Sequence, residues 1–334
     1  MQTTIATTNV MLLAAGRSTR LGPLGLALPK PLVPICGHPA IAFGLHACAR
    51  AGFPEVVVNV FHLGDRLRES LGDGAAFGLR IRYSVEKELL GTGGGIAKAR
   101  ALFGPGPVLV MNAKVVADLD LPALLGAHAA GRGVATMLLR DDPDPRRWGA
   151  IGVDGAGRVV EILGRRSPIP ASGAVTLRMF TGVHVIEPLL LDRLAPRPCD
   201  VIRDAYIPAL EAGARIMAAR LPGYFAEHST PERYLAGNLA LLGDPSLIPH
   251  PPGPLTGVDP AATVADGAVI TAPVRVQAGA LIHSGARVGP GVVVGAGARV
   301  AAGVRLERAV VWPAVTISAD AASAVITPDG VVAI

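Results

Sequence analysis

The sequence predicts an α/β fold in which a domain built on a mostly parallel sheet is followed by a short left-handed parallel β-helix. The first observation is the apolar run Val10–Ala14, which reads as a buried strand and ends at Gly16, where the backbone turns sharply or approaches a ligand. The second is that further apolar runs alternate with helical patterns, as in a parallel sheet covered by helices. The third is that aliphatic residues recur every six positions from Val258 onward, which is typical of a hexapeptide-repeat β-helix.

The elements of the first domain follow from local apolar patterns. Short apolar runs predict the later strands, and spacings of three or four residues predict the helices. The expected strands cover residues 55–60, 79–83, 107–111, 135–139 and 216–221. The expected helices cover residues 41–51, 64–71, 94–102, 121–130 and 200–210.

A proline-rich stretch and a repeat complete the chain. We place a first domain at residues 1–244, a linker at 245–256 and the β-helix at 257–334. The positions six residues apart are all aliphatic or aromatic: Val258, Val264, Ile270, Val276, Ile282, Val288, Val294, Val300, Leu306 and Trp312. They are expected inside the helix, which makes roughly three coils. Its expected role is homo-oligomerisation or capping of a pocket, because His283 alone is a weak basis for an acyltransferase site.

Composition limits the class of protein. The net charge of +5 is spread over 334 residues without a basic run, which suits anionic small molecules and gives little support for nucleic-acid binding. Three widely spaced cysteines predict neither a disulfide framework nor a zinc site, and they suit the cytoplasm. Val10–Ala14 lacks the flanks of a signal peptide, and glycine, proline and histidine interrupt residues 32–49, so no membrane span is expected.

The first strand is followed by groups suited to a polyphosphate. Thr19 and Arg20 come soon after Gly16, at the carboxyl end of a strand, where open α/β sheets bind ligands. Lys30 lies between two prolines, which fix φ on either side and remove competing N–H donors. Two cations and free backbone N–H groups at one strand end indicate a phosphate-binding site.

These residues resemble a known signature. The segments Leu13–Gly16, Thr19–Leu21, Pro23–Leu24 and Pro29–Pro31 are similar to that of the sugar-1-phosphate nucleotidylyltransferases, except that Ser18 replaces a glycine. The resemblance implies a Rossmann-like, GT-A-like nucleotidyltransferase domain. No P-loop sequence occurs in the chain. The region from residue 62 to 95 looks most like uridylyltransferases acting on N-acetylmuramic acid 1-phosphate, with mannose-1-phosphate guanylyltransferases close behind.

The resemblance also assigns roles to residues. Arg20 and Lys30 are the implied catalytic residues, stabilising the departing pyrophosphate and the α-phosphate respectively. The implied nucleotide-binding residues are Leu13, Ala14, Ala15, Gly16, Thr19, Glu86, Gly91, Thr92 and Asn112. Gly149 is expected to contact the sugar, and Arg165 can grip the sugar phosphate bidentately. The resemblance implies a strand at residues 179–188, and His184 within it reads as a core histidine.

The metal-binding positions depart from the family pattern. The family has Asn-Gly-Asp where this chain has Asn112-Ala113-Lys114, so a magnesium ligand has become a cation. The second ligand position carries Glu227 in place of aspartate, and Gly164 replaces a sugar-binding glutamate. Magnesium is therefore expected to bind the protein weakly and to arrive mainly with the nucleotide.

The implied reaction joins a sugar 1-phosphate to a nucleoside triphosphate, giving a nucleoside diphosphate sugar and pyrophosphate. Its nucleophile is an ionised phosphate oxygen, so no general base is required. The alternative is a catalytically silent homologue that binds nucleotide sugar and regulates a partner enzyme; Ser18, Lys114, Gly164 and Glu227 favour it. The base, the sugar and the oligomeric state are left open by the sequence.

Overall fold

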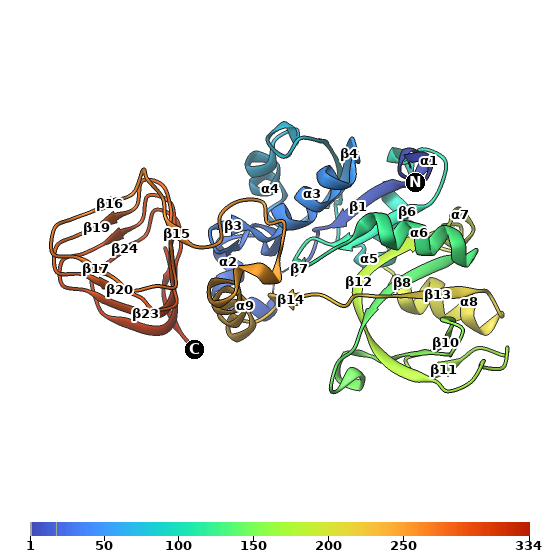
Figure 1. Cartoon of the computed structure of the whole chain (residues 1–334). Helices are drawn as coiled ribbons and strands as arrows, with labels where there is room; N and C mark the ends of the chain where they lie inside the picture. The colour runs from blue at the N-terminus through green and yellow to red at the C-terminus, as the bar shows by residue number, and fades with distance from the viewer. Residues whose placement is uncertain (1, 18) are drawn as a thin grey trace. The chain divides into compact units, whose positions relative to one another are not determined.

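The computed structural model describes residues 2–17 and 19–334, which form two compact units (Figure 1). Unit 1 comprises Met1–Gly16, Gly44–Val115 and Leu119–Phe225, and unit 2 comprises Arg17–Phe43, Val116–Asp118 and Ala226–Ile334. Ser18 of the signature lies outside the described residues. The predicted division into a domain at residues 1–244, a linker at 245–256 and a β-helix at 257–334 stays a prediction.

Unit 1 is built on one large sheet. Its strands are β1 (Asn9–Leu13), β4 (Glu55–Val60), β5 (Arg80–Val85), β6 (Val108–Asn112), β8 (Ala135–Arg140), β9 (Ile151–Val153), β10 (Val159–Ile162), β11 (Arg165–Arg166), β12 (Thr176–Ile186) and β13 (Ile216–Arg220). Their order is β11-β10-β9-β12-β6-β1-β4-β5, and β8 pairs with β12 and β13. A separate two-stranded sheet, whose residues belong mostly to unit 2, holds β7 (Val115–Ala117) and β14 (Phe225–Glu227).

The pairing confirms the predicted mostly parallel sheet for the strands around β1, whereas β9, β10 and β11 extend it through antiparallel pairs. Strand β1 runs parallel to β4 and β6, β4 to β5, and β8 to β13. Strand β12 is antiparallel to both β6 and β8, so β8 has the direction of β6. The carboxyl ends of β4, β1, β6, β8 and β13 consequently lie along the same edge of the sheet. Open α/β sheets bind their ligands outside this edge.

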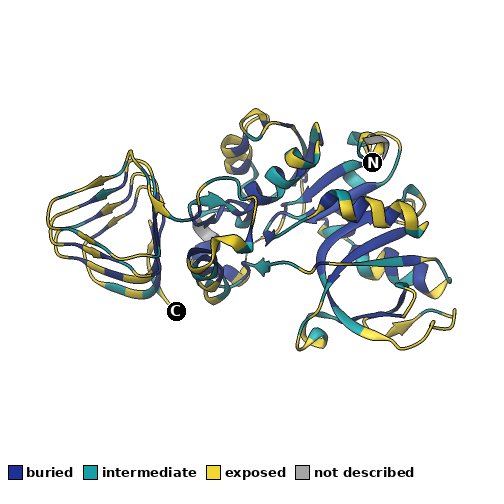
Figure 2. Ribbon diagram, in the orientation of Figure 1, coloured by how far each residue is buried: buried dark blue, intermediate teal, exposed yellow. Residues whose placement is uncertain are grey.

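Helices cover the sheet and close the core of unit 1. They are α1 (Gln2–Thr7), α3 (Ala40–Ala51, which begins in unit 2), α4 (Gly64–Leu71), α5 (Gly91–Ala99), α6 (Leu121–Gly131), α7 (Pro188–Leu191) and α8 (Ile207–Glu211), with a π-helical turn, η6, at Ile202–Tyr206. Apolar residues of the central strands, such as Met11, Val110 and Met137, are fully buried with Tyr206. Figure 2 shows the central strands of this sheet mostly in the colour of buried residues. Helix α5 begins at Gly91, three residues before the predicted start at residue 94, so all of Gly93–Gly95 lies within the helix.

Unit 2 contains the loop with Lys30, a helix and the repeat region. Its first elements are η1 (Thr19–Leu21), α2 (Leu24–Ala27), η2 (Lys30–Leu32), the hairpin β2 (Pro34–Ile35) and β3 (His38–Pro39), then α9 (Pro231–Gly243) and η7 (Pro245–Leu247). The repeat strands are β15 (Gly257–Val258), β16 (Thr263–Val264), β17 (Val269–Ile270), β18 (Val274–Val276), β19 (Leu281–Ile282), β20 (Arg287–Val288), β21 (Val292–Val294), β22 (Arg299–Val300), β23 (Arg305–Val311), β24 (Thr316–Ile317), β25 (Ala321–Thr327) and β26 (Gly330–Ala333).

The repeat strands stack as the coils of a parallel β-helix, in agreement with the prediction. Strand β15 pairs in parallel with β18 and β18 with β21, while β16, β19, β22 and β24 form a second parallel face. From Val276 to Trp312 the residues at six-residue intervals are buried. Val258 and Val264 are 42% and 38% exposed, because they belong to the first coil, which has no coil before it.

Among the described residues, no helix is both long and apolar enough to cross a bilayer.

Candidate functional site

Three adjacent strands end level with one another at the carboxyl edge of the sheet in unit 1. In the pairing register Leu13 of β1 lies beside Asn59 of β4 and Asn112 of β6. Ala14 and Ala15 continue from β1 and are buried, whereas Gly16 is exposed. A Cβ placed on Gly16 would meet no heavy atom within 4 Å, so the space beside this glycine is open. The predicted nucleotide-binding residues Leu13–Gly16 and Asn112 therefore share one sheet edge.

Asn59 joins the end of β1 to Glu86. Its Oδ1 accepts the N–H of Ala14 at 2.8 Å, and its Nδ2 donates to Glu86 Oε1 at 2.7 Å. The other oxygen of Glu86 accepts the N–H of Leu90 at 3.1 Å. Glu86 is buried, so this network satisfies a carboxylate that would otherwise be costly to bury. Glu86, predicted to bind the nucleoside, therefore also shapes the backbone around it.

Asn59 was not among the predicted site residues, although its place in the sequence gives a signal. It is a polar residue within the otherwise apolar run of β4, and such residues are buried only with partners. Gly95 completes the arrangement, because a Cβ there would approach Asn59 Nδ2 and Glu86 Oε1 to 2.8 Å. The glycine of α5 thus allows the helix to pack closely on this polar network.

The start of α5 is fixed by the segment around residue 200. Thr92 Oγ1 donates to Asp200 Oδ2 at 3.1 Å and accepts the N–H of Val201 at 2.9 Å. Gly91 has φ +71°, and a Cβ there would lie 2.6 Å from the carbonyl oxygen of Cys199. Both predicted nucleotide-binding residues, Gly91 and Thr92, consequently have a role in chain packing. Asp200 was not predicted as a site residue.

Asn112 and Lys114 follow β6 at the same edge. Ala113, between them, donates its N–H to the carbonyl of Leu13 at 3.1 Å, which keeps the chain beside β1 after the strand has ended. A Cβ on Gly182 would lie 2.0 Å from Asn112 Nδ2, so the amide rests against a glycine with φ +79°. Lys114 is half-buried.

The predicted sugar-side residues lie in the segments from residue 145 to 166. Gly149 adopts φ +82°, and a Cβ there would approach Leu163 Cδ2 to 2.5 Å, so glycine is required. Arg165 is exposed on β11, and its Nε donates to Glu211 Oε1 at 2.7 Å. For Arg165 to bind a sugar phosphate with its full guanidinium group, it would have to release Glu211.

The two predicted catalytic cations both belong to unit 2. Lys30 begins the short helix η2, in which Leu32 donates its N–H to Pro29 O at 2.8 Å and Val33 donates to Lys30 O at 3.3 Å. This turn, flanked by prolines, gives the lysine a defined backbone conformation. Arg20 lies with Thr19 in η1 and its side chain is 62% exposed, which leaves it accessible to a ligand.

Glu227 lies among cations in unit 2. Its Oε1 is 3.8 Å from Arg20 Nη2, its Oε2 is 3.5 Å from Arg233 Nη1, and Ser229 Oγ donates to the same carboxylate. The side chain of Glu227 is only 12% exposed. A carboxylate held between two guanidinium groups in this way is poorly suited to a divalent cation.

The family metal therefore does not fit the protein groups that are present. Within residues 2–17 and 19–334 no cluster of three histidine, cysteine, aspartate or glutamate side chains could hold an ion. The position expected to supply an aspartate carries Lys114, and the carboxylate of Glu227 pairs with arginines.

The loop that carries Lys30 continues into the β2–β3 hairpin, which is anchored to the rest of unit 2. Tyr234 of α9 donates its hydroxyl proton to Pro34 O at 2.6 Å, and Trp312 Nε1 donates to the same hydroxyl at 3.0 Å. Cys36 donates its N–H to Asn238 Oδ1 at 2.7 Å. All these groups are buried, so the hairpin next to Lys30 is held by α9 and the β-helix together.

His184 is a core residue, as predicted. It is 2% exposed, and its Nδ1 lies 2.7 Å from the hydroxyl of Tyr206. Burial lowers the pKa of His184 to about 3, so the imidazole is neutral at physiological pH.

A family model and several known proteins match this chain in sequence. Residues 9–164 match the family model described as nucleotidyl transferase. A mannose-1-phosphate guanylyltransferase of Mycobacterium tuberculosis is 32% identical over 266 residues, covering 79% of this chain and 71% of that protein. A probable mannose-1-phosphate guanylyltransferase of Arabidopsis thaliana is 30% identical, covering 78% and 74%. A mannose-1-phosphate guanyltransferase of Schizosaccharomyces pombe is also 30% identical, covering 76% and 72%.

Proposed function

Because the chain belongs to the sugar-1-phosphate nucleotidylyltransferase family, we propose that it synthesises a nucleoside diphosphate sugar from a nucleoside triphosphate and a sugar 1-phosphate. An oxygen of the sugar phosphate attacks the α-phosphorus of the triphosphate. A new P–O bond forms, the bond between the α-phosphorus and the bridging oxygen breaks, and pyrophosphate leaves.

One observation carries this proposal. The ends of β4, β1 and β6 are level at one sheet edge, and the chain leaves β1 there through the open backbone of Gly16. Backbone N–H groups at such an edge bind phosphate oxygens. We assign the nucleotide to this edge, with Leu13–Gly16, Glu86, Gly91, Thr92 and Asn112 around it.

Cationic side chains are proposed to stabilise the phosphates of the substrates and to hold them in position. We assign Arg20 to the leaving pyrophosphate, Lys30 to the α-phosphate and Arg165 to the sugar phosphate, with Gly149 beside the sugar. Since the nucleophile is already ionised, catalysis requires alignment and charge stabilisation and no proton acceptor. In the free protein Glu227 lies near Arg20, so pyrophosphate would compete with this carboxylate for the guanidinium group.

Magnesium enters this proposal with the substrate. Magnesium commonly binds to the phosphates of a nucleoside triphosphate, and a protein then supplies only one or two carboxylates to the ion. The nucleotide substrate is therefore proposed to be the magnesium complex of a nucleoside triphosphate.

The relatives suggest the first substrates to test. Their names specify transfer of a guanylyl group to mannose 1-phosphate. We propose GTP and mannose 1-phosphate as the first pair, ahead of UTP and N-acetylmuramic acid 1-phosphate. The proposed reaction takes place in the cytoplasm, and the β-helix is proposed to form homo-oligomers.

A second candidate function rests on the Glu227 cluster. Pairing of Glu227 with Arg20 and Arg233 removes a family metal ligand and engages a proposed catalytic arginine. This arrangement favours a silent homologue that binds nucleotide sugar and regulates a partner enzyme.

One experiment separates the two functions. Pyrophosphate release is measured for each nucleoside triphosphate against a set of sugar 1-phosphates, with and without magnesium, and GDP-mannose binding is measured by calorimetry. The enzyme releases pyrophosphate stoichiometrically with NDP-sugar for at least one pair. Binding of the nucleotide sugar without turnover of any pair would instead favour the regulatory homologue.

A further inference from the structure

A cavity of about 300 Å³ in unit 1 lies away from the carboxyl edge of the sheet. It is lined by the start of β10, the turn at residues 167–169 and the residues that lead into β13. Arg215 and Ile216 open β13, whose direction is that of β8, so they lie at the amino edge of the sheet. The five residues of β13 span about 16 Å, which separates this cavity from the edge that follows β1.

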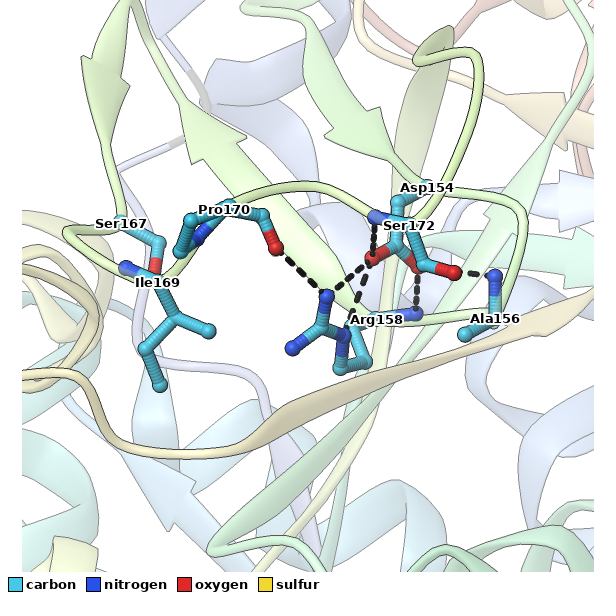
Figure 3. A network of polar contacts seen from close by, with 7 residues as sticks. All are labelled: Asp154, Ala156, Arg158, Ser167, Ile169, Pro170 and Ser172. Atoms are coloured by element: carbon cyan, nitrogen blue, oxygen red, sulfur yellow. Dashed lines mark hydrogen bonds and ion pairs between the residues drawn. The ribbon is translucent and has the colours of Figure 1, made fainter.

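Arg158 forms one wall of the cavity, and hydrogen bonds on the side away from the cavity fix the orientation of its guanidinium group. Arg158 donates from Nε and Nη2 to Asp154 Oδ2 at 2.9 and 2.7 Å, and Nη2 also donates to Pro170 O at 2.8 Å (Figure 3). The carboxylate of Asp154 further accepts the N–H groups of Ala156, Arg158 and Ser172. Burial alone raises the pKa of Asp154, but these hydrogen bonds outweigh burial and lower the pKa to about 2. Asp154 therefore stays ionised and keeps Arg158 in place.

The free side of this guanidinium group faces the cavity. Figure 3 shows the third nitrogen, Nη1, pointing toward Ile169 and away from Asp154. The described residues supply no hydrogen-bond partner for Nη1. Its two N–H groups are thus directed into the cavity by a rigid support, and a ligand would not have to order the side chain.

The other polar groups of the cavity are also donors. Ser167 Oγ accepts the N–H of Ile169 at 3.1 Å, which leaves its hydroxyl proton free to donate. Arg215 is exposed beside it and adds a second guanidinium group. The nearby carboxylates are already paired, Asp154 with Arg158 and Glu211 with Arg165. The cavity therefore presents positive charge and hydrogen-bond donors without a facing carboxylate.

We propose that this cavity is a second ligand site, which binds the phosphoryl or carboxylate group of a small metabolite between Arg158, Ser167 and Arg215. Guanidinium groups bind both oxyanions through paired, charge-assisted hydrogen bonds. The volume is at the lower end of the range for small-molecule sites, roughly 300–1,000 Å³, which suits a small metabolite. Apolar side chains of Val159 and Ile169 line the rest and would contact the carbon skeleton.

The test uses hydrogen exchange measured by mass spectrometry on the full chain. Exchange of peptides covering residues 157–170 and 213–217 is followed with inorganic phosphate, with malonate as a carboxylate, and with chloride at matched ionic strength. Arg215→Ala and Ser167→Ala are the site variants; the side chain of Arg215 is exposed and its carbonyl keeps the bond from Val134, so the fold is preserved. Arg193→Ala removes an exposed arginine elsewhere, and Lys30→Ala removes a cation from the candidate site.

We expect at least one of the two anions to slow exchange in both peptides several-fold relative to chloride. The concentration for half-maximal protection should rise at least about tenfold in Arg215→Ala, since one charge-assisted contact is lost. It should rise less in Ser167→Ala and stay unchanged in Arg193→Ala and Lys30→Ala. Comparison of phosphate with malonate tells which oxyanion the cavity prefers. The proposal is overturned when neither anion protects these peptides, or when Arg215→Ala responds like the parent.

Discussion

Lys30 owes its place to the backbone around it. Prolines on both sides and the turn of η2 restrict the main chain, so the ammonium group is presented from a stiff loop. We expect Lys30→Ala to lower kcat by about two to three orders of magnitude, as when other charge-stabilising donors are removed. The circular dichroism spectrum should not change, because the side chain is only half-buried. Arg193→Ala is the matched control for loss of an exposed positive charge, and equal turnover in both variants contradicts the role of Lys30.

Lys114 is a cation at the position where the resemblance predicts a magnesium ligand. Two unit charges about 4 Å apart interact by about 4 kcal/mol at an effective dielectric constant of about 20, and a divalent ion about doubles this repulsion. We therefore expect Lys114→Asp to raise turnover and to lower the magnesium concentration needed for half-maximal rate. The measurement is a magnesium titration at fixed nucleotide.

Lys114→Ala separates removal of the ammonium group from gain of a carboxylate. It should show a smaller gain than Lys114→Asp. A fully active parent together with an inactive aspartate variant at every magnesium concentration would instead make Lys114 a catalytic group.

His184 makes stability depend on pH. The unfolded chain takes up a proton at this residue below about pH 6.5, whereas the folded chain does so only near pH 3, because burial lowers the pKa. The free energy of unfolding should therefore fall as the pH is lowered from 6.5 toward 3, with up to about 1.4 kcal/mol per pH unit from this group. Urea unfolding at pH 7 and pH 5 measures the fall, which His184→Gln should reduce. An identical fall in the parent and the variant would show that His184 does not contribute.

Tyr234 connects three elements of unit 2 through one hydroxyl group. It donates to Pro34 beside the Lys30 loop and accepts from Trp312 of the β-helix. Tyr234→Phe leaves both of these buried groups without their partner, at a cost of about 1–3 kcal/mol each. We expect faster hydrogen exchange in residues 33–40 and a lower kcat, because the hairpin next to Lys30 loosens.

Tyr206→Phe provides the matched control for Tyr234→Phe. It also deletes a hydroxyl from a fully buried tyrosine, but that hydroxyl contacts His184 in unit 1. Exchange in residues 33–40 should be unaffected by it. If exchange rises in both variants or in neither, the anchoring role of Tyr234 is wrong. If exchange is faster in Tyr234→Phe but the parent protein has no measurable turnover, the anchoring role of Tyr234 is supported. The absence of turnover would then count against the proposed enzyme activity.

At the scale of the whole molecule, the first coil of the β-helix offers a surface for association with another copy of the chain. Strands β15, β16 and β17 end their sheets, and Val258 and Val264 are exposed although they occupy inward positions of the repeat. Open strand edges with apolar side chains are surfaces on which proteins associate. We expect the proposed homo-oligomer to use this end, and Val264→Glu to lower the mass in solution to that of a single chain.

Light scattering after size-exclusion chromatography measures this mass. Val331→Glu places the same charge on another exposed valine, in β26 near the end of the chain, and serves as the control. An unchanged oligomer in Val264→Glu, or a parent that is already a single chain, would count against association through the first coil.

The sequence by itself determined the features that depend on neighbouring residues. The apolar run of β1, the alternation of strands and helices and the six-residue repeat are local patterns, and each predicted its element in the structure. The turn at Lys30 also follows from its two prolines. Local patterns predicted the start of α5 less well. The helix begins at Gly91 and not at the predicted residue 94, because the segment around Cys199 packs against its first turn.

Only the tertiary structure decided which side chains support one another. Asn59 meets Glu86, Tyr234 meets Trp312, and Arg165 meets Glu211 because the fold brings together residues that are far apart in the chain. No periodicity or motif encodes such a pair, since each partner looks ordinary in its own segment. Burial then makes the pairing obligatory, because an unpaired polar group inside a protein is costly. The pattern of residues therefore sets the elements and the candidate site, and the packing of those elements sets the partners of each polar group.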